Sequence, residues 1–212
     1  MNIPNRLSLT RLIITPIMMF FYLASFIPFG RLVAFLLFVI AACTDFLDGM
    51  IARKRNLVTD LGKLLDPIAD KCLMMATLLL VIAWPVADGL PIVSSNPNYV
   101  GVIGIVGGIV ILAREFIVSA LRMIAASKGI VLKADQIGRV KTTFQDITFG
   151  GYLFYAFLVT EFALSKTLNA VFGLGLLALF AVSIILTVVS GIGYLVKNKS
   201  VFNDKADDEE EE

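Results

Sequence analysis

The sequence contains no histidine and only two cysteines, Cys43 and Cys72, among its 212 residues. The absence of histidine removes the most usual catalytic base near neutral pH. Two isolated cysteines in apolar surroundings provide neither a disulfide framework nor a thiolate zinc site. Any acid–base or metal chemistry in this chain must therefore use carboxylates.

Charged residues are also scarce. They make up 17% of the chain, compared with about a quarter in an average soluble domain. Hydrophobic residues make up 58%, which excludes disorder for nearly the whole chain and is too apolar for a water-soluble protein of this size. The 18 Lys and Arg residues almost balance the 17 Asp and Glu residues, so the net charge does not indicate a nucleic-acid partner.

Long apolar stretches are abundant. A membrane-spanning helix needs about 20 mostly apolar residues, and six stretches meet this requirement: 7–28, 32–53, 61–86, 99–126, 143–164 and 168–196. The connections between them are short. The sequence therefore predicts an all-α integral membrane protein, with six transmembrane helices in one domain over residues 1–202.

The distribution of positive charge predicts the orientation of this domain. Six spans place both termini on the same side, and every Lys and Arg except Arg31 and Lys166 falls on or near that side. Because Lys and Arg concentrate in cytoplasmic segments, we expect both termini to be cytoplasmic. Residues 203–212 are polar and acidic without apolar anchors, which predicts a disordered, solubilising tail.

Four aspartates lie within or beside these spans, where an ionised group costs at least about 2.5–3.5 kcal/mol. Asp45 and Asp48 lie near the end of the second span, and Asp66 and Asp70 lie early in the third. Spacings of three and four residues place each pair on one helix face. The short basic loop between the spans brings both pairs to the same cytoplasmic end. Such an all-oxygen set favours Mg²⁺ or Mn²⁺, and paired metals recur in phosphoryl chemistry.

Two other interpretations of the aspartates are open. Nearby cations could form an interfacial ion-pair network with them; these are Arg53, Lys54, Arg55, Lys63 and Lys71. Intramembrane carboxylates also bind substrate in cation transporters. A transporter needs a path through the membrane, however, and Glu161 is the only acidic residue near the other end of a span.

Residues beside the aspartates are suited to phosphate binding. Gly49 has no side chain, so a ligand can approach its backbone closely. Ala52 has only a small side chain and leaves room on the same side of the helix. Arg53 is a forked donor for phosphate. Gly62 gives a second point of close approach, one turn before Asp66.

Written out, the segment reads Asp45-x2-Asp48-Gly49-x2-Ala52-Arg53-x8-Gly62-x3-Asp66-x3-Asp70. It resembles the signature of the CDP-alcohol phosphotransferase family at every fixed position. The resemblance implies a six-helix membrane enzyme, usually a homodimer, with its site open to the cytoplasmic interface. It also implies that Asp45, Asp48 and Asp66 are ligands of a metal pair. Asp70 resembles the residue that both contacts the metal site and acts as general base.

The same resemblance assigns the nucleotide contacts. It implies that Gly49 and Arg53 hold the CDP diphosphate and that Ala52 and Gly62 lie near the nucleotide. Thr59 corresponds to a polar nucleotide contact. Asn5 lies in the family's entry segment and is either a nucleotide contact or a cap on the first helix.

A second region indicates the acceptor. Arg114-Glu115-Phe116 and Gly138-Arg139-x-Lys141-Thr142-x2-Gln145 resemble the phosphatidylglycerophosphate synthases, the branch of the family that uses glycerol 3-phosphate. That branch usually has Lys where this chain has Arg139. A phosphorylated acceptor needs cations, so Arg114, Arg139 and Lys141 are expected to bind its phosphate. The alternative interpretation is that these three cations only mark the cytoplasmic side of the membrane.

The expected function is therefore transfer of a phosphatidyl group from CDP-diacylglycerol to glycerol 3-phosphate in phospholipid biosynthesis. The product would be phosphatidylglycerol phosphate. We expect an integral plasma-membrane enzyme among membrane lipids, with its active site facing the cytoplasm. Inositol phosphate, serine and phosphatidylglycerol remain open as alternative acceptors.

Overall fold

The computed structural model describes residues 3–55, 60–83, 98–128, 132, 136–162 and 164–199. For some helical residues, including 45–55, 60–64, 66 and 139, it describes the course of the helix but not the side chain. The acidic tail predicted for residues 203–212 lies outside the described residues.

The described residues form six α-helices and no strand. They are α1 (Ile3–Leu23), α2 (Gly30–Arg55), α3 (Asp60–Ala83), α5 (Asn98–Ser127), α6 (Gln136–Glu161) and α7 (Lys166–Lys197). Each corresponds to one of the six predicted spans, so the all-α prediction is confirmed. By length and apolar composition, three described segments are able to cross a membrane: Asn5–Leu23, Val102–Ser127 and Lys166–Lys197. A crossing by the other three helices stays a prediction.

Two helix boundaries differ most from the prediction. Helix α1 ends at Leu23 and a turn follows, in which Phe29 has a φ of 57°. A Cβ at Gly30 would lie 2.6 Å from the carbonyl oxygen of Phe21, so the missing side chain lets α2 begin close beside α1. Helix α6 begins at Gln136, seven residues before the predicted span. The prediction began later because the first two turns of α6 are polar and do not read as a membrane span.

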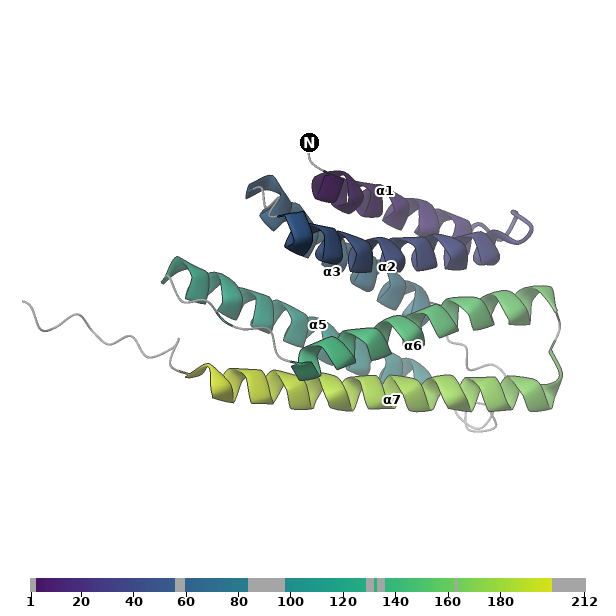
Figure 1. Ribbon diagram of the computed structural model, residues 1–212. Helices are drawn as coiled ribbons and strands as arrows, with labels where there is room; N and C mark the ends of the chain where they lie inside the picture. The colour runs from purple at the N-terminus through teal and green to yellow at the C-terminus, as the bar shows by residue number, and fades with distance from the viewer. Residues whose placement is uncertain are drawn as a thin grey trace, which may run out of the picture.

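The helices form a bundle in which α2 packs against both α1 and α6 (Figure 1). Helix α3 also packs on α1, and α7 packs on α5 and α6. Every helix contributes to one apolar core, which includes Met18, Phe38, Leu78, Ile111, Phe149 and Phe180. Consecutive helices run in opposite directions (Figure 1). The end of α2 and the starts of α3 and α6 therefore lie at the same end of the bundle.

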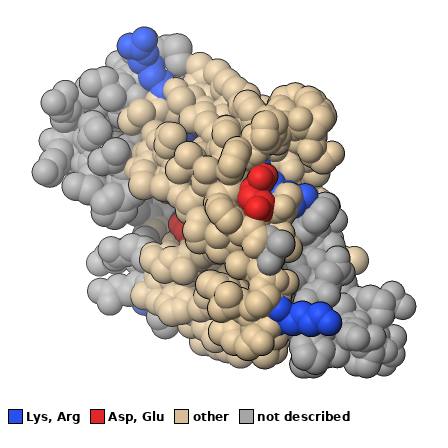
Figure 2. Space-filling view, turned by 90° about the vertical axis from the view of Figure 1, so that its right-hand side faces the viewer, with Lys and Arg blue, Asp and Glu red and all other residues tan. Residues whose placement is uncertain are grey.

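The opposite end of the bundle carries few charges. Figure 2 views it from the side where α1 turns into α2 and α6 turns into α7, and the described surface is mostly uncharged. There, the backbone N–H of Phe29 donates to Glu161 Oε1 at 3.3 Å. The Arg31 guanidinium donates to the carbonyl oxygen of Ala156 at 3.5 Å. These contacts fasten the α1–α2 turn to the last turns of α6.

Candidate active site

The aspartate motif lies on two helices at one end of the bundle. Helix α2 is continuous through residues 45–53, and α3 is continuous through residues 62–70. The helical register therefore sets Asp45 one turn from Asp48, and Asp66 one turn from Asp70, as the spacing predicts. Thr59 lies outside the described residues, and so do the side chains or surroundings of Asp45, Asp48, Gly49, Ala52, Arg53, Gly62, Asp66 and Arg139.

Asp70 is the motif aspartate whose side chain is described. It is exposed, and its carboxylate interacts electrostatically with the ammonium group of Lys141 on α6. No group of three Asp, Glu or Cys side chains suited to a metal ion occurs among the side chains that the structure describes. The electrostatic interaction of Asp70 with Lys141 relates the motif on α3 to one of the residues predicted to bind the acceptor.

Lys141 and Arg114, two of the three predicted acceptor-binding residues, meet at one carboxylate. Arg114 Nη1 donates to Glu115 Oε1 at 2.9 Å, and Lys141 Nζ donates to the same oxygen. The Lys141 side chain is fully buried, and those of Arg114 and Glu115 are 14% exposed. In this low-dielectric setting Glu115 stabilises both cations and fixes their separation.

Helix α7 positions Arg114 from the other side. Arg114 Nη2 donates to Ser190 Oγ at 3.0 Å. A Cβ at Gly191 would lie 2.9 Å from Arg114 Cγ, so the glycine leaves room for the arginine stem. Tyr194 lies one turn after Ser190 on α7, and Arg122 Nε donates to its hydroxyl at 3.2 Å while the guanidinium stacks over that ring. Two arginines of α5 are thus held by the last turns of α7.

Asn5 is buried, with 3% of its surface exposed. It lies within the first turn of α1, which begins at Ile3, and not at the preceding cap position. Ser8, Arg11 and Thr15 are also buried and follow Asn5 at spacings of three, three and four residues. Because these spacings place them on one helix face, α1 turns a polar stripe towards the rest of the bundle.

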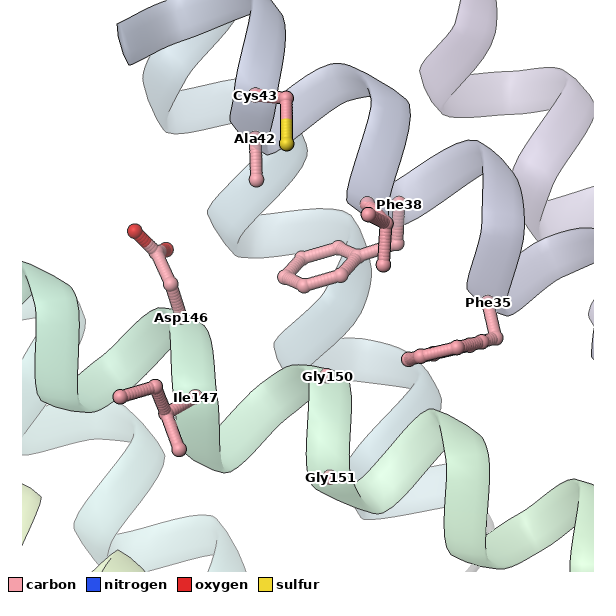
Figure 3. A pocket seen from close by; sticks show the side chains of 9 residues that line it. Phe35, Phe38, Ala42, Cys43, Asp146, Ile147, Gly150 and Gly151 are labelled. Atoms are coloured by element: carbon pink, nitrogen blue, oxygen red, sulfur yellow. The ribbon is translucent and has the colours of Figure 1, made fainter.

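An apolar groove lies between α2 and α6, beside the turn of α2 that leads into the motif (Figure 3). Its volume is about 300 Å³. It is lined by Phe35, Phe38, Val39, Ala42, Cys43, Asp146, Ile147, Gly150 and Gly151. In Figure 3 the Asp146 side chain extends from α6 on the side that faces α2. The groove therefore combines apolar walls with one carboxylate. One of its lining residues, Cys43, lies only two residues before Asp45.

Comparison with known proteins decides the family. The family model of the CDP-alcohol phosphatidyltransferases matches residues 1–189. The chain belongs to this family. The family resemblance of the aspartate motif is therefore confirmed.

Three relatives resemble the chain over nearly their full length. A CDP-diacylglycerol–glycerol-3-phosphate 3-phosphatidyltransferase of Bacillus subtilis (strain 168) is 35% identical over 210 residues, covering 93% of this chain and 95% of the relative. A protein of the same name from Rickettsia typhi is 32% identical over 209 residues, covering 95% of this chain and 99% of the relative. Another, from Salmonella typhimurium, is 35% identical over 202 residues, covering 92% and 93%.

Several residues of this site were not assigned a role from the sequence. Glu115 was noted only as a neighbour of Arg114, although it links both cations. Ser190 and Gly191 lie 76 and 77 residues beyond Arg114 in an apolar helix, and nothing in their local sequence indicates the contact. Asp146 was not assigned a role either, although its position as a carboxylate near the start of a predicted span could have indicated one.

Proposed function

We propose that this chain transfers the phosphatidyl group of CDP-diacylglycerol to glycerol 3-phosphate, giving phosphatidylglycerol phosphate and CMP. The observation that carries this proposal is the buried Arg114–Glu115–Lys141 cluster, whose Lys141 interacts with Asp70 of the family motif. A phosphorylated acceptor needs cations close to the group that deprotonates its hydroxyl. The relatives described above carry the name of this activity.

We place the enzyme in the plasma membrane as a homodimer, with six crossing helices, cytoplasmic termini and a cytoplasm-facing site. Three long apolar segments support membrane insertion. The bias of Lys and Arg supports the orientation. Many large apolar side chains are exposed on the outside of the bundle, among them Ile109, Phe116, Val171 and Ile185. Lipid tails are the surroundings that suit them.

The aspartates fit a pair of Mg²⁺ or Mn²⁺ ions. The continuous helices α2 and α3 give each aspartate pair a shared face, and a carboxylate set without histidine or cysteine suits hard cations. Asp45, Asp48, Asp66 and Asp70 would hold the ions. Bound there, the metal would polarise the diphosphate and offset the charge of the carboxylates.

The chain's own residues account for the remaining steps. Gly49 and Arg53 hold the diphosphate of CDP-diacylglycerol, while Ala52, Gly62, Thr59 and Asn5 surround the cytidine. Asp70 accepts the proton of the acceptor's primary hydroxyl. The resulting oxygen bonds to the lipid-side phosphorus as the bond from that phosphorus to the CMP oxygen breaks. CMP leaves with its negative charge stabilised by Arg53.

The acceptor phosphate is held by Arg114, Arg139 and Lys141. Glu115 orients the first and last of these, because one of its oxygens accepts from both. Serine lacks a phosphate, and its single carboxylate is balanced by its own ammonium group, so it adds no net negative charge beside Glu115 for these cations. The cation cluster therefore favours glycerol 3-phosphate over serine. Inositol phosphate and phosphatidylglycerol also carry a phosphate, and an assay with separate acceptors distinguishes glycerol 3-phosphate from these two.

The proposed function is tested by CMP release from the purified protein with CDP-diacylglycerol and separate acceptors. We expect glycerol 3-phosphate to support the fastest release and free glycerol to be a poor acceptor, because glycerol lacks the phosphate. Faster release with serine, inositol phosphate or phosphatidylglycerol would assign another acceptor. The transferase chemistry would still stand in that case.

Neutralising one acceptor cation should weaken acceptor binding selectively. An Arg–phosphate contact contributes about 1.5–3 kcal/mol, so Arg114→Ala, Arg139→Ala and Lys141→Ala should each raise the KM for glycerol 3-phosphate by roughly ten- to a hundredfold. The KM for CDP-diacylglycerol should change much less, since its diphosphate is assigned to Arg53. Lys166→Ala, at the opposite end of the bundle, is the matched control. Wild-type acceptor kinetics in all three variants would remove these residues from the acceptor site.

The groove between α2 and α6 suits an acyl chain of the lipid substrate. Val39 lines it, whereas the adjacent Ile40 is exposed elsewhere on α2. Val39→Trp should fill the groove and raise the KM for dioleoyl CDP-diacylglycerol about tenfold, the order of effect of losing one or two buried methylene contacts. The KM for the short dihexanoyl substrate should stay near that of the wild type. An equal effect of Ile40→Trp would mean that the groove does not hold the chain.

A further inference from the structure

Gln145 on α6 is a buried amide whose donor lacks a partner. Its side chain is 3% exposed, and no described residue accepts a hydrogen bond from its Nε2. A buried donor without an acceptor is costly, because it has given up its water without replacement. A bound ligand can supply the acceptor that the described residues do not.

The neighbouring polar side chains on this part of the α6–α7 interface are paired. Thr148, one turn after Gln145, donates to the Phe144 carbonyl at 2.7 Å and lies 3.1 Å from Ser183 Oγ on α7. Thr187 donates to the Ser183 carbonyl at 2.6 Å. The Gln145 amide nitrogen therefore contrasts with the hydroxyl groups of Thr148 and Thr187, which have hydrogen-bond partners.

The position of Gln145 relates it to the cation cluster. It follows Lys141 by four residues on the same helix, so the two side chains share a face with their Cβ atoms about 5–6 Å apart. Both are buried. A molecule that binds Lys141 through a phosphate can therefore reach Gln145 with a group two or three bonds further along.

The chemistry of that group follows from the two kinds of donor. Arg114 and Lys141 are charged and suit a phosphate. An amide is neutral and has both a donor and an acceptor, which matches a hydroxyl. Glycerol 3-phosphate has a hydroxyl on its middle carbon, between the phosphate and the primary hydroxyl that we assign to Asp70. Lys141 interacts electrostatically with Asp70, which relates the phosphate-binding cation to the carboxylate assigned to the reacting hydroxyl.

We propose that Gln145 hydrogen-bonds the secondary hydroxyl of glycerol 3-phosphate and thereby selects a polyol phosphate over a simple alkyl phosphate. This inference rests on the proposed function, because it concerns the same acceptor site. It adds to the binding of charge a means of recognising the carbon chain of the acceptor. A site built around a substrate hydroxyl disfavours the analogue that lacks it, because the buried amide is then left unpaired.

The test compares two acceptors that differ in this hydroxyl alone. In 3-hydroxypropyl phosphate the primary hydroxyl and the phosphate keep their spacing, but the middle hydroxyl is missing. For the wild type in CDP-diacylglycerol micelles, we expect kcat/KM to be about 10–100-fold higher with glycerol 3-phosphate. Gln145→Leu should lower kcat/KM for glycerol 3-phosphate by a similar factor and change that for 3-hydroxypropyl phosphate by less than about threefold, so that the preference disappears.

Thr148→Val is the matched control. Thr148 is buried one turn away on the same helix and has partners of its own, so its loss should leave the acceptor preference at the wild-type value. Gln145→Met, similar in length to glutamine, gives the same comparison if the leucine variant does not fold. Equal use of both acceptors by the wild type would overturn this inference alone, as would a wild-type preference retained in the Gln145 variants. Failure of the wild type to use either acceptor phosphate would overturn the proposed function.

Discussion

An Asp70→Asn enzyme is expected to turn over about 10²–10⁴ times more slowly than the wild type, the usual effect of losing a general base. The amide keeps the shape of the carboxyl group but cannot take the proton from the acceptor hydroxyl. Asp70 is suitably placed for this role, because its side chain is exposed on α3 and interacts with Lys141. Binding of CDP-diacylglycerol should largely persist, since the diphosphate is assigned to Gly49 and Arg53.

The measurement is single-turnover CMP release, together with CDP-diacylglycerol binding measured separately. Asp146→Asn is an informative comparison, because Asp146 also interacts electrostatically with Lys141 but lies outside the aspartate motif. It should lower turnover far less than Asp70→Asn. If the two variants lost turnover equally, the effect of Asp70 would be electrostatic support of Lys141 and not proton transfer. Near-wild-type turnover in Asp70→Asn would exclude it as the base.

The sequence predicts the helices well but places their ends less well. Residues 24–29 are mostly apolar, so composition continues the first span through a segment that the structure shows as a turn. That turn depends on the close approach of Gly30 to the carbonyl of Phe21, a contact between two helices. At α6 the opposite occurs: Arg139 and Lys141 lie in the first turns, where their charge lowers the local hydropathy although the backbone is helical.

The predictability of the site follows the same distinction between local and tertiary information. The motif aspartates are recognisable because their spacing is local to two helices. Arg114 and Lys141 were predicted from their resemblance to the glycerol-3-phosphate branch, but their link through Glu115 depends on how α5 and α6 pack in the folded bundle. The contact of Arg114 with Ser190 joins residues 76 positions apart. Such a contact follows from the packing of α7 and leaves no trace in the sequence near either residue.

Removing one predicted metal ligand should have the largest effect of all. Asp45→Ala, Asp48→Ala and Asp66→Ala are each expected to abolish detectable CMP release, and EDTA should do the same to the wild type. The physical reason is that four carboxylates at one end of α2 and α3 repel one another strongly unless cations lie between them. Losing one ligand therefore weakens both the binding of the metal and the neutralisation of the diphosphate.

Metal binding is measured directly, by titrating Mn²⁺ and following the decrease of its free electron paramagnetic resonance signal. We expect the three alanine variants to bind Mn²⁺ at least about tenfold more weakly, a loss of about 1.4 kcal/mol or more. Asp60→Ala is the matched control, because Asp60 begins α3 but lies outside the motif, and it should bind as the wild type does. Helix content from circular dichroism separates loss of metal from loss of fold. Full CMP release in EDTA would contradict a metal-dependent mechanism, whereas wild-type Mn²⁺ binding by an inactive, folded variant would assign that aspartate to substrate binding instead.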